Sequence, residues 1–246
     1  MIAIFYLALQ ILKLYSYVVI ANVIVSWLVA FNVLNTQNRF VYSILELTYR
    51  LTDPFLNRIR RFLPNLGSLD ILVNCAAMVG TDEIKGWLEP VQNQSEEVWR
   101  DALEINLTVP FIITKKLIPI LKDATNPSVI NIGSIYGVLG PDWSLYNSGD
   151  IKGTPAAYAA SKGGLIQLTR WLATSLAPGV RVNAIVPGGV ERDTPVRFKQ
   201  EYEKRTPLKR LAKEEDVKGV SVFLASDASS YITGQCIMVD GGWSVW

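Results

Sequence analysis

A tyrosine and a lysine four residues apart form the pair in this chain that is best suited to chemistry. Tyr158 and Lys162 lie in the run AAYAASKGGL, which predicts a helix. Residues four apart share one helix face, about one turn from each other. A phenol with a pKa of about 10 exchanges protons poorly at neutral pH, and a neighbouring ammonium lowers that value. The pair therefore predicts a general acid or base, although Tyr-x-x-x-Lys alone is weak evidence.

Two more polar residues stand where a sheet and a helix would present them to a ligand. Ser134 follows the strand-like run SVINIG, and doubly wound sheets bind ligands at the carboxyl ends of their strands. Asn106 lies within the helix-like run EINLTVPF, although asparagine is not a strong helix former. One interpretation of Asn106 is a solvated polar helix face, and the other is a role beside Ser134 and Tyr158.

The segments that would position these residues alternate between strand-like and helix-like runs. Short apolar runs predict strands at 70–75, 128–133, 180–186 and 236–240. Longer runs predict helices at about 95–122, 155–177 and 214–226, with Ser95 suited to cap the first of them. Apolar strands that alternate with helices indicate an α/β fold whose parallel sheet is covered on both faces.

Composition excludes several other kinds of protein. The chain has no histidine, which excludes a Ser-His-Asp triad and argues against a catalytic metal site, so no metal is expected. Cys75 and Cys236 are far apart in the sequence, so they predict no disulfide framework and are interpreted as small buried residues in strands. A net charge of +2 is too small to indicate nucleic-acid binding.

Together, the motifs of residues 70–246 resemble the short-chain dehydrogenase/reductase family. Besides Asn106, Ser134 and the Tyr158–Lys162 pair, the matching runs are DILVNCAA, IVPGGV and ITGQCIMVDGG. The resemblance implies a Rossmann-like doubly wound sheet and NAD or NADP as cofactor. It further implies that Tyr158 transfers the proton, Lys162 lowers the pKa of Tyr158, Ser134 binds the substrate oxygen and Asn106 positions a water. The implied cofactor contacts are Asn74, Ala76, Tyr158, Lys162, Pro187, Gly188, Val190 and Thr194.

The segment with which this family begins is missing, so the predicted Rossmann-like sheet is incomplete. The family starts with a strand and a glycine-rich turn whose amides hold the pyrophosphate, yet all 17 glycines here lie at or after Gly67. Losing two or three hydrogen bonds to charged groups, at about 1.5–3 kcal/mol each, would weaken binding roughly a thousandfold or more. Without the first strand, Ile71, Leu72 and Val73 are expected to form an exposed apolar edge.

The first 69 residues predict a membrane segment instead. Residues 14–34 carry no charge, and about 20 helical residues cross a bilayer core, although a buried core helix is the alternative. Residues 37–63 predict amphipathic helices with a basic face. The run LTDPFLNRIRRFLPNLGSLD (51–70) resembles the integral-membrane YggT family. Arginines after the apolar stretch predict a membrane protein, of the bacterial inner membrane, with residues 70–246 on the cytoplasmic side.

The resulting hypothesis is a membrane-tethered NAD(P)-dependent oxidoreductase for a carbonyl or alcohol, with sugar-derived compounds as candidate substrates. The long loop before Tyr158 supplies Trp143, Tyr146 and Asn147 for a polar pocket, and residues 190–210 are expected to form a mobile substrate lid. One alternative is a catalytically inactive fusion or chimera, because GSLD (67–70) fits both families. Another is a partner chain that supplies the nucleotide-binding half. The expected partners are a small-molecule substrate, membrane lipid and further copies of the chain, without nucleic acid.

Overall fold

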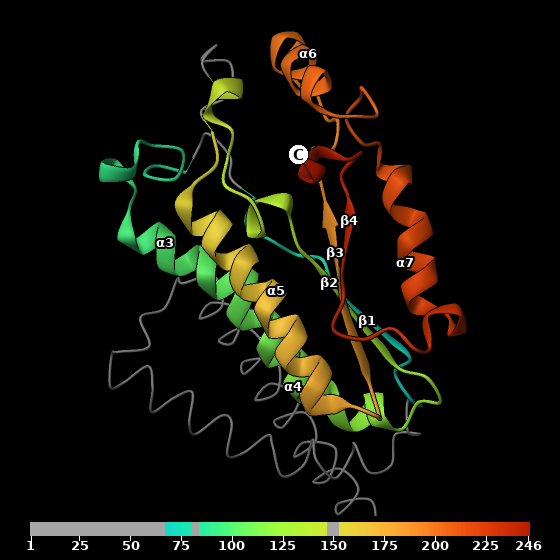
Figure 1. The fold of residues 1–246 in the computed structure, drawn as a ribbon. Coiled ribbons are helices and arrows are strands. Elements are labelled where there is room, and N and C mark those ends of the chain that lie inside the picture. The colour runs from blue at the N-terminus through green and yellow to red at the C-terminus, as the bar shows by residue number, and fades with distance from the viewer. Residues whose placement is uncertain (1–66, 80–83, 147–152) are drawn as a thin grey trace, which may run out of the picture. The chain divides into compact units, whose positions relative to one another are not determined.

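The computed structural model describes residues 67–79, 84–146 and 153–246 (Figure 1). The chain divides into two units, Met1–Leu66 and Gly67–Trp246, and the fold described below is that of the second. The predicted transmembrane helix at 14–34, the amphipathic helices at 37–63 and the pocket residue Asn147 lie outside the described residues. In the described part of the chain, no helix has the length and apolar character needed to cross a bilayer.

Four parallel strands form the sheet, in the spatial order in which they occur along the chain. They are β1 (Ile71–Asn74), β2 (Ser128–Ile132), β3 (Arg181–Pro187) and β4 (Cys236–Val239). The register places Val73 opposite Ile130, Ile130 opposite Asn183, and Ile185 opposite Ile237. The predicted α/β fold with a parallel sheet is therefore confirmed, and each strand lies within about one residue of its predicted bounds.

Helices cover both faces of this sheet. On one face lie α3 (Glu96–Leu103), a π-helical turn (Glu104–Thr108), α4 (Val109–Lys122) and α5 (Ala156–Leu176), and on the other lies α7 (Lys218–Ala225), as Figure 1 shows. The helix α6 (Val196–Arg205) lies beyond the carboxyl ends of the strands, within the segment expected to form a lid. The remaining helical turns are short and lie at Val91–Asn93, Ile135–Gly137, Trp143–Tyr146, Glu214–Val217, Asp227–Ser229 and Trp243–Val245.

The core has two layers because successive strand residues point to opposite faces. Val129 and Val182 are fully buried and cluster with Leu172 of α5. Ile130 and Ile185 face the other way and cluster with Leu224 of α7. Strands buried on both faces need apolar residues at nearly every position, which is why the sequence shows continuous runs rather than alternation.

A chain of buried polar side chains ties β1 to the rest of the domain. Asn74 Nδ2 donates to Asn131 Oδ1 at 2.8 Å, and Asn131 Nδ2 donates to Thr169 Oγ1 at 2.8 Å. Thr169 Oγ1 in turn donates to the carbonyl of Leu165 at 2.8 Å, within α5. Because these buried amides are mutually satisfied, the chain fixes how β1, β2 and α5 sit against one another.

The strand β1 is the edge of the described sheet, and on the face that β2 turns toward α7 its side chains are apolar and exposed. Ile71 is 42% exposed and Val73 is 47% exposed, whereas Leu72 lies against the core. The expected apolar edge is thus present at Ile71 and Val73. The interpretation of both cysteines as buried strand residues was wrong for Cys75, which is exposed because β1 ends one residue earlier, at Asn74. Cys236 is partly buried in β4.

Candidate active site

Ser134 and Tyr158 meet beyond the carboxyl end of β2. Ser134 caps the helical turn Ile135–Gly137, where its Oγ accepts a hydrogen bond from the amide of Tyr136 at 3.2 Å. Tyr158 lies in the first turn of α5, and it lines the same cleft as Ser134. Gly137 allows this closeness, because a Cβ there would lie 2.8 Å from the carbonyl carbon of Lys162. A serine and a tyrosine far apart in sequence thus present paired hydroxyls at one point.

The pKa of Tyr158 differs in direction from the sequence-based expectation. Burial raises the pKa of Tyr158 above its usual value, and the hydrogen bond from Ser134 offsets this only in part. The ammonium of Lys162 lies 5.9 Å from the centre of the Tyr158 ring and donates to the carbonyl of Ile132 at 2.7 Å. Burial is thus the dominant influence on the pKa of Tyr158, and the role of Lys162 in lowering that pKa stays a prediction.

Lys162 is itself buried, with 3% of its surface exposed. Burial lowers the pKa of Lys162 to about 8, and the thiol of Cys75 opposes this shift. An ammonium has three donors, and in the described part of the chain the bond to Ile132 is the one hydrogen bond found for it. Buried donors without a partner are costly, so this amine is suited to bind further hydroxyl groups, as the ribose of a nicotinamide cofactor would supply.

Asn106 is almost completely buried, at 1% exposure, so the solvated-face interpretation was wrong. It lies in the π-helical turn between α3 and α4, a distortion that occurs frequently at functional sites. Asn106 Oδ1 accepts from the amide of Met78 at 2.7 Å, and its Nδ2 donates to the carbonyl of Met78 at 3.1 Å and to Ser161 Oγ at 3.0 Å. Ser161 Oγ donates to the carbonyl of Tyr158 at 2.8 Å. Asn106 thereby links the segment after β1 to the turn that carries Tyr158.

The residues implied as cofactor contacts divide into two groups. Asn74 is held in the buried polar chain, and Ala76 is exposed in the segment that follows β1. Pro187 ends β3, and Gly188 follows it with its amide donating to the carbonyl of Val239 at 3.0 Å. Val190 and Thr194 lie farther along the same segment and line a cleft together with Tyr158. Lys162, Tyr158 and this segment fit the nicotinamide end of the cofactor, but no glycine precedes Gly67 to fit its pyrophosphate.

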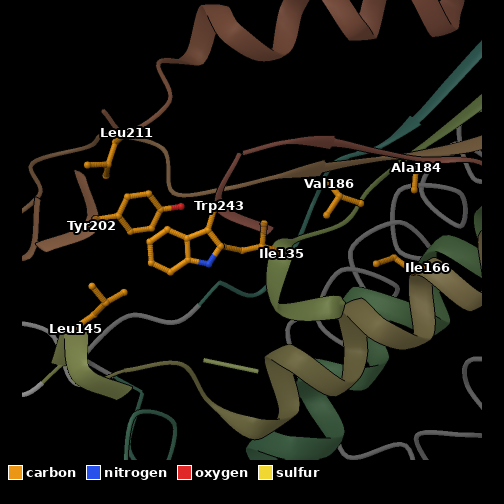
Figure 2. Packing of buried hydrophobic residues seen from close by; sticks show 8 residues of the cluster. All are labelled: Ile135, Leu145, Ile166, Ala184, Val186, Tyr202, Leu211 and Trp243. Atoms are coloured by element: carbon orange, nitrogen blue, oxygen red, sulfur yellow. The ribbon is translucent and has the colours of Figure 1, made fainter. Parts of the chain in front are cut away.

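Tyr202 of α6 is a site residue that the sequence did not single out. Its hydroxyl accepts a hydrogen bond from the amide of Gly189 at 2.7 Å, and its ring stacks on Trp243 with centroids 4.3 Å apart (Figure 2). Burial raises the pKa of Tyr202 to about 12. A Cβ at Gly189 would lie 2.9 Å from Tyr202 Cζ, so the glycine pair after Pro187 lets α6 approach β3. The only sequence signal was that glycine pair.

These groups surround a cleft of about 300 Å³. Hydroxyl side chains predominate among its polar lining, which comprises Ser134, Tyr136, Tyr146, Thr154, Tyr158, Thr194 and Tyr202. A larger hollow of about 780 Å³ is also lined by Tyr146 and Thr154, and reaches Trp143 and Gln94. The predicted pocket residues Trp143 and Tyr146 therefore do line hollows beside the Ser134–Tyr158 pair.

Comparison with known proteins places two families along the chain. The family model described as enoyl-(acyl carrier protein) reductase matches residues 57–244, and the CCB3/YggT model matches residues 1–79. The two matches overlap at residues 57–79, which contain the run GSLD that fits both motifs. The YggT-like resemblance of the N-terminal segment is thus confirmed.

Individual relatives agree with this assignment. The chain is 34% identical over 204 residues to the 3-oxoacyl-(acyl carrier protein) reductase FabG of Thermotoga maritima, covering 81% of this chain and 75% of that protein. A short-chain dehydrogenase from Leptospira borgpetersenii with bound NAD+ superimposes with a TM-score of 0.64 at 32% identity, over 79% of this chain and 70% of that one. A gluconate 5-dehydrogenase from Burkholderia cenocepacia in complex with NADP and tartrate gives a TM-score of 0.64 at 27% identity, over 76% and 69%. From its sheet, its site and these relatives, the chain belongs to the short-chain dehydrogenase/reductase family.

Proposed function

We propose that this chain is a membrane-tethered, NAD(P)-dependent oxidoreductase that interconverts a carbonyl compound and its alcohol. The observation that carries the proposal is the hydroxyl pair of Ser134 and Tyr158 beside the buried amine of Lys162, at the edge where such sheets bind ligands. NAD or NADP would supply or accept the hydride when bound. Related proteins with bound NAD+ or NADP support this choice of cofactor.

The side chains define how the proton would move. Because burial raises the pKa of Tyr158, its phenol is protonated at neutral pH and is able to donate to a carbonyl oxygen that Ser134 holds by a hydrogen bond. In the opposite direction Tyr158 must first lose its proton. Because burial raises that pKa, alcohol oxidation should keep speeding up as pH rises through the usual phenol value of about 10, whereas carbonyl reduction should not speed up.

Cofactor binding tests the proposal directly. NADH or NADPH fluorescence is titrated against the purified, detergent-solubilised chain, and saturation below millimolar cofactor is the expected result. Absence of binding up to millimolar concentrations would eliminate an autonomous enzyme. Turnover, where found, is then compared between the wild type and Tyr158→Phe, and unchanged turnover would refute the proposed proton donor.

Membrane tethering is the part of the proposal that rests on the first segment. The match of residues 1–79 to the CCB3/YggT model and the uncharged run at 14–34 support it, and the arginines that follow favour a cytoplasmic catalytic portion. Alkaline carbonate extraction of membranes is the test. The chain should remain in the membrane pellet, and release into the supernatant would contradict a spanning helix.

A second candidate is that the chain needs a partner to bind cofactor, or has lost activity as a fusion. The exposed Ile71 and Val73 on the edge strand β1 and the lack of glycine before Gly67 favour it. In a complete sheet a preceding strand would pair with β1, and its phosphate-binding turn would lead into a helix on a face of the sheet. The same fluorescence titration separates the two candidates. Binding by the isolated chain favours the first, and a failure to bind favours the second.

A further inference from the structure

We infer that the cleft beside Tyr158 accepts a neutral polyhydroxylated compound, a sugar or a polyol, in preference to an organic acid or an acyl chain. The inference rests on the proposed oxidoreductase function and narrows its substrate class. It draws on three features of the cleft wall: a chain of linked hydroxyls, no cationic side chain among the described lining residues, and a row of aromatic rings.

The linked hydroxyls are those of Tyr136, Tyr146 and Thr154. The Tyr136 and Tyr146 hydroxyl oxygens are 2.5 Å apart, and the Tyr146 oxygen is 3.3 Å from Thr154 Oγ1. Each hydroxyl has one donor and two acceptor positions, so the two links leave one donor and several acceptor positions free. Burial raises the pKa of Tyr136, which keeps its phenol protonated. The wall thus offers both donors and acceptors, as adjacent hydroxyls on a sugar require.

Charge on the wall disfavours an anionic substrate. Among the described residues that line this cleft and the adjoining larger hollow, none is a lysine or arginine, and the one charged side chain is Glu89. A carboxylate or phosphate would lose its hydration without gaining a charge-assisted hydrogen bond from these side chains, and Glu89 would repel it. Neutral hydroxyl groups exchange hydrogen bonds with water for similar bonds with the wall at little cost.

Aromatic rings form the apolar part of the same wall. The ring centroids of Tyr146 and Phe198 lie 5.7 Å apart, and those of Phe198 and Tyr202 lie 6.0 Å apart. Trp143 continues the row, 5.8 Å from Tyr146. Binding pockets commonly combine apolar and aromatic surface with a few placed polar groups. A sugar ring matches this combination, because its C–H faces are apolar and its edge carries hydroxyls.

The test uses D-glucose and D-glucuronate, which share a pyranose ring and differ at C6, where glucuronate carries a carboxylate. Cyclohexanol serves as an alcohol that has a single hydroxyl. Binding to the detergent-solubilised full chain is measured by saturation-transfer NMR without cofactor, in the wild type, Tyr136→Phe, Tyr146→Phe and the control Tyr231→Phe. Tyr231 is fully exposed, at 102%, and lies away from the cleft lining. Circular dichroism checks that each variant is folded.

We expect glucose to bind at least tenfold more tightly than glucuronate or cyclohexanol. Glucose affinity should fall about tenfold in Tyr136→Phe and Tyr146→Phe and stay unchanged in Tyr231→Phe. Equal or tighter binding of glucuronate, or glucose affinity unaffected by both phenol deletions, would overturn the inference, as would a failure of glucose to bind. Turnover with NAD(P)+ is measured in parallel. Oxidation of cyclohexanol without glucose binding would refute the inferred substrate class and leave the oxidoreductase proposal standing. Glucose binding without any turnover would refute the oxidoreductase proposal and leave the binding preference of the cleft standing.

Discussion

The carboxyl end of β2 and the edge strand β1 differ in how fully their side chains are packed and hydrogen-bonded. At the first, Ser134 and Tyr158 line one cleft, and Asn106 is hydrogen-bonded to Ser161, 55 residues away in the sequence. At the second, Ile71 and Val73 are substantially exposed, and β2 is the one strand that pairs with β1 in the described residues. The groups that would move a proton are therefore all in place, whereas the sheet of the described residues ends at β1, on the side where the family holds the cofactor phosphates.

The largest effect is expected from removing the phenol hydroxyl of Tyr158 at the carboxyl end of β2. Tyr158→Phe should reduce turnover by about a hundredfold to ten-thousandfold, because a positioned proton donor contributes about that much. Steady-state rates of carbonyl reduction measure it. Tyr231→Phe, at a fully exposed tyrosine, is the matched control and should keep the wild-type rate. Comparable rates in the two variants would show that the Tyr158 phenol does not contribute to turnover.

A smaller but still large effect, on stability, is expected from interrupting the buried hydrogen-bonded chain Asn74–Asn131–Thr169, which joins β1 to β2 and α5. Asn131→Ala leaves the buried amide of Asn74 with only the longer bond to Thr114 Oγ1 and leaves Thr169 Oγ1 without its donor. The free energy of unfolding should fall by about 3 kcal/mol. Urea denaturation followed by tryptophan fluorescence is the measurement. The exposed Asn93→Ala serves as control. If Asn131→Ala costs no more than the control, β1 is not held by this chain.

The pH dependence of stability tests whether Lys162 is buried at the site as the structure shows. Its pKa is about 8 in the folded chain against 10.5 as the usual value, so between these values the unfolded chain binds the proton that the folded chain lacks. Stability due to this group therefore rises with pH, by about 2–3 kcal/mol between pH 8 and 10. Denaturation at several pH values should show this rise in the wild type and in the exposed Lys122→Met, and should lose it in Lys162→Met. If the difference in unfolding free energy between the wild type and Lys162→Met did not change with pH, this prediction would be contradicted.

The smallest change in folding free energy is expected at the open edge. Val73→Lys places a charge on the exposed side of β1 and should alter stability by less than about 0.5 kcal/mol. It should nevertheless reduce self-association, because lysine on an edge strand blocks pairing with another chain. Light scattering at rising protein concentration measures this. Val222→Lys, on exposed α7 surface, should have less effect. Equal reductions of self-association by the two substitutions would show that β1 promotes self-association no more than other exposed surface does.

Much of the fold and part of the site could be predicted from the sequence because the signals are local. The apolar runs predicted the strands, since a strand buried on both faces must be apolar throughout. The helix predicted at about 95–122 contains a π-helical turn at Glu104–Thr108, which periodicity does not reveal. Asn106 gave the one hint of it, as a poor helix former in the middle of a helix. Tyr202 could not be found, because its partners Gly189 and Trp243 are brought to it only by folding.

The sequence by itself determined which chemical groups are available and how adjacent ones are spaced: Tyr158 and Lys162 one helical turn apart, Ser134 at the end of a strand, and no glycine before Gly67. Only the tertiary structure decided how those groups behave. It buries Tyr158 and Lys162, which shifts the pKa of the phenol up and that of the amine down, and it gathers the hydroxyls of Tyr136, Tyr146 and Thr154 on one wall. The reason is that desolvation and hydrogen bonding depend on neighbours from distant segments, whereas spacing along a helix or strand does not.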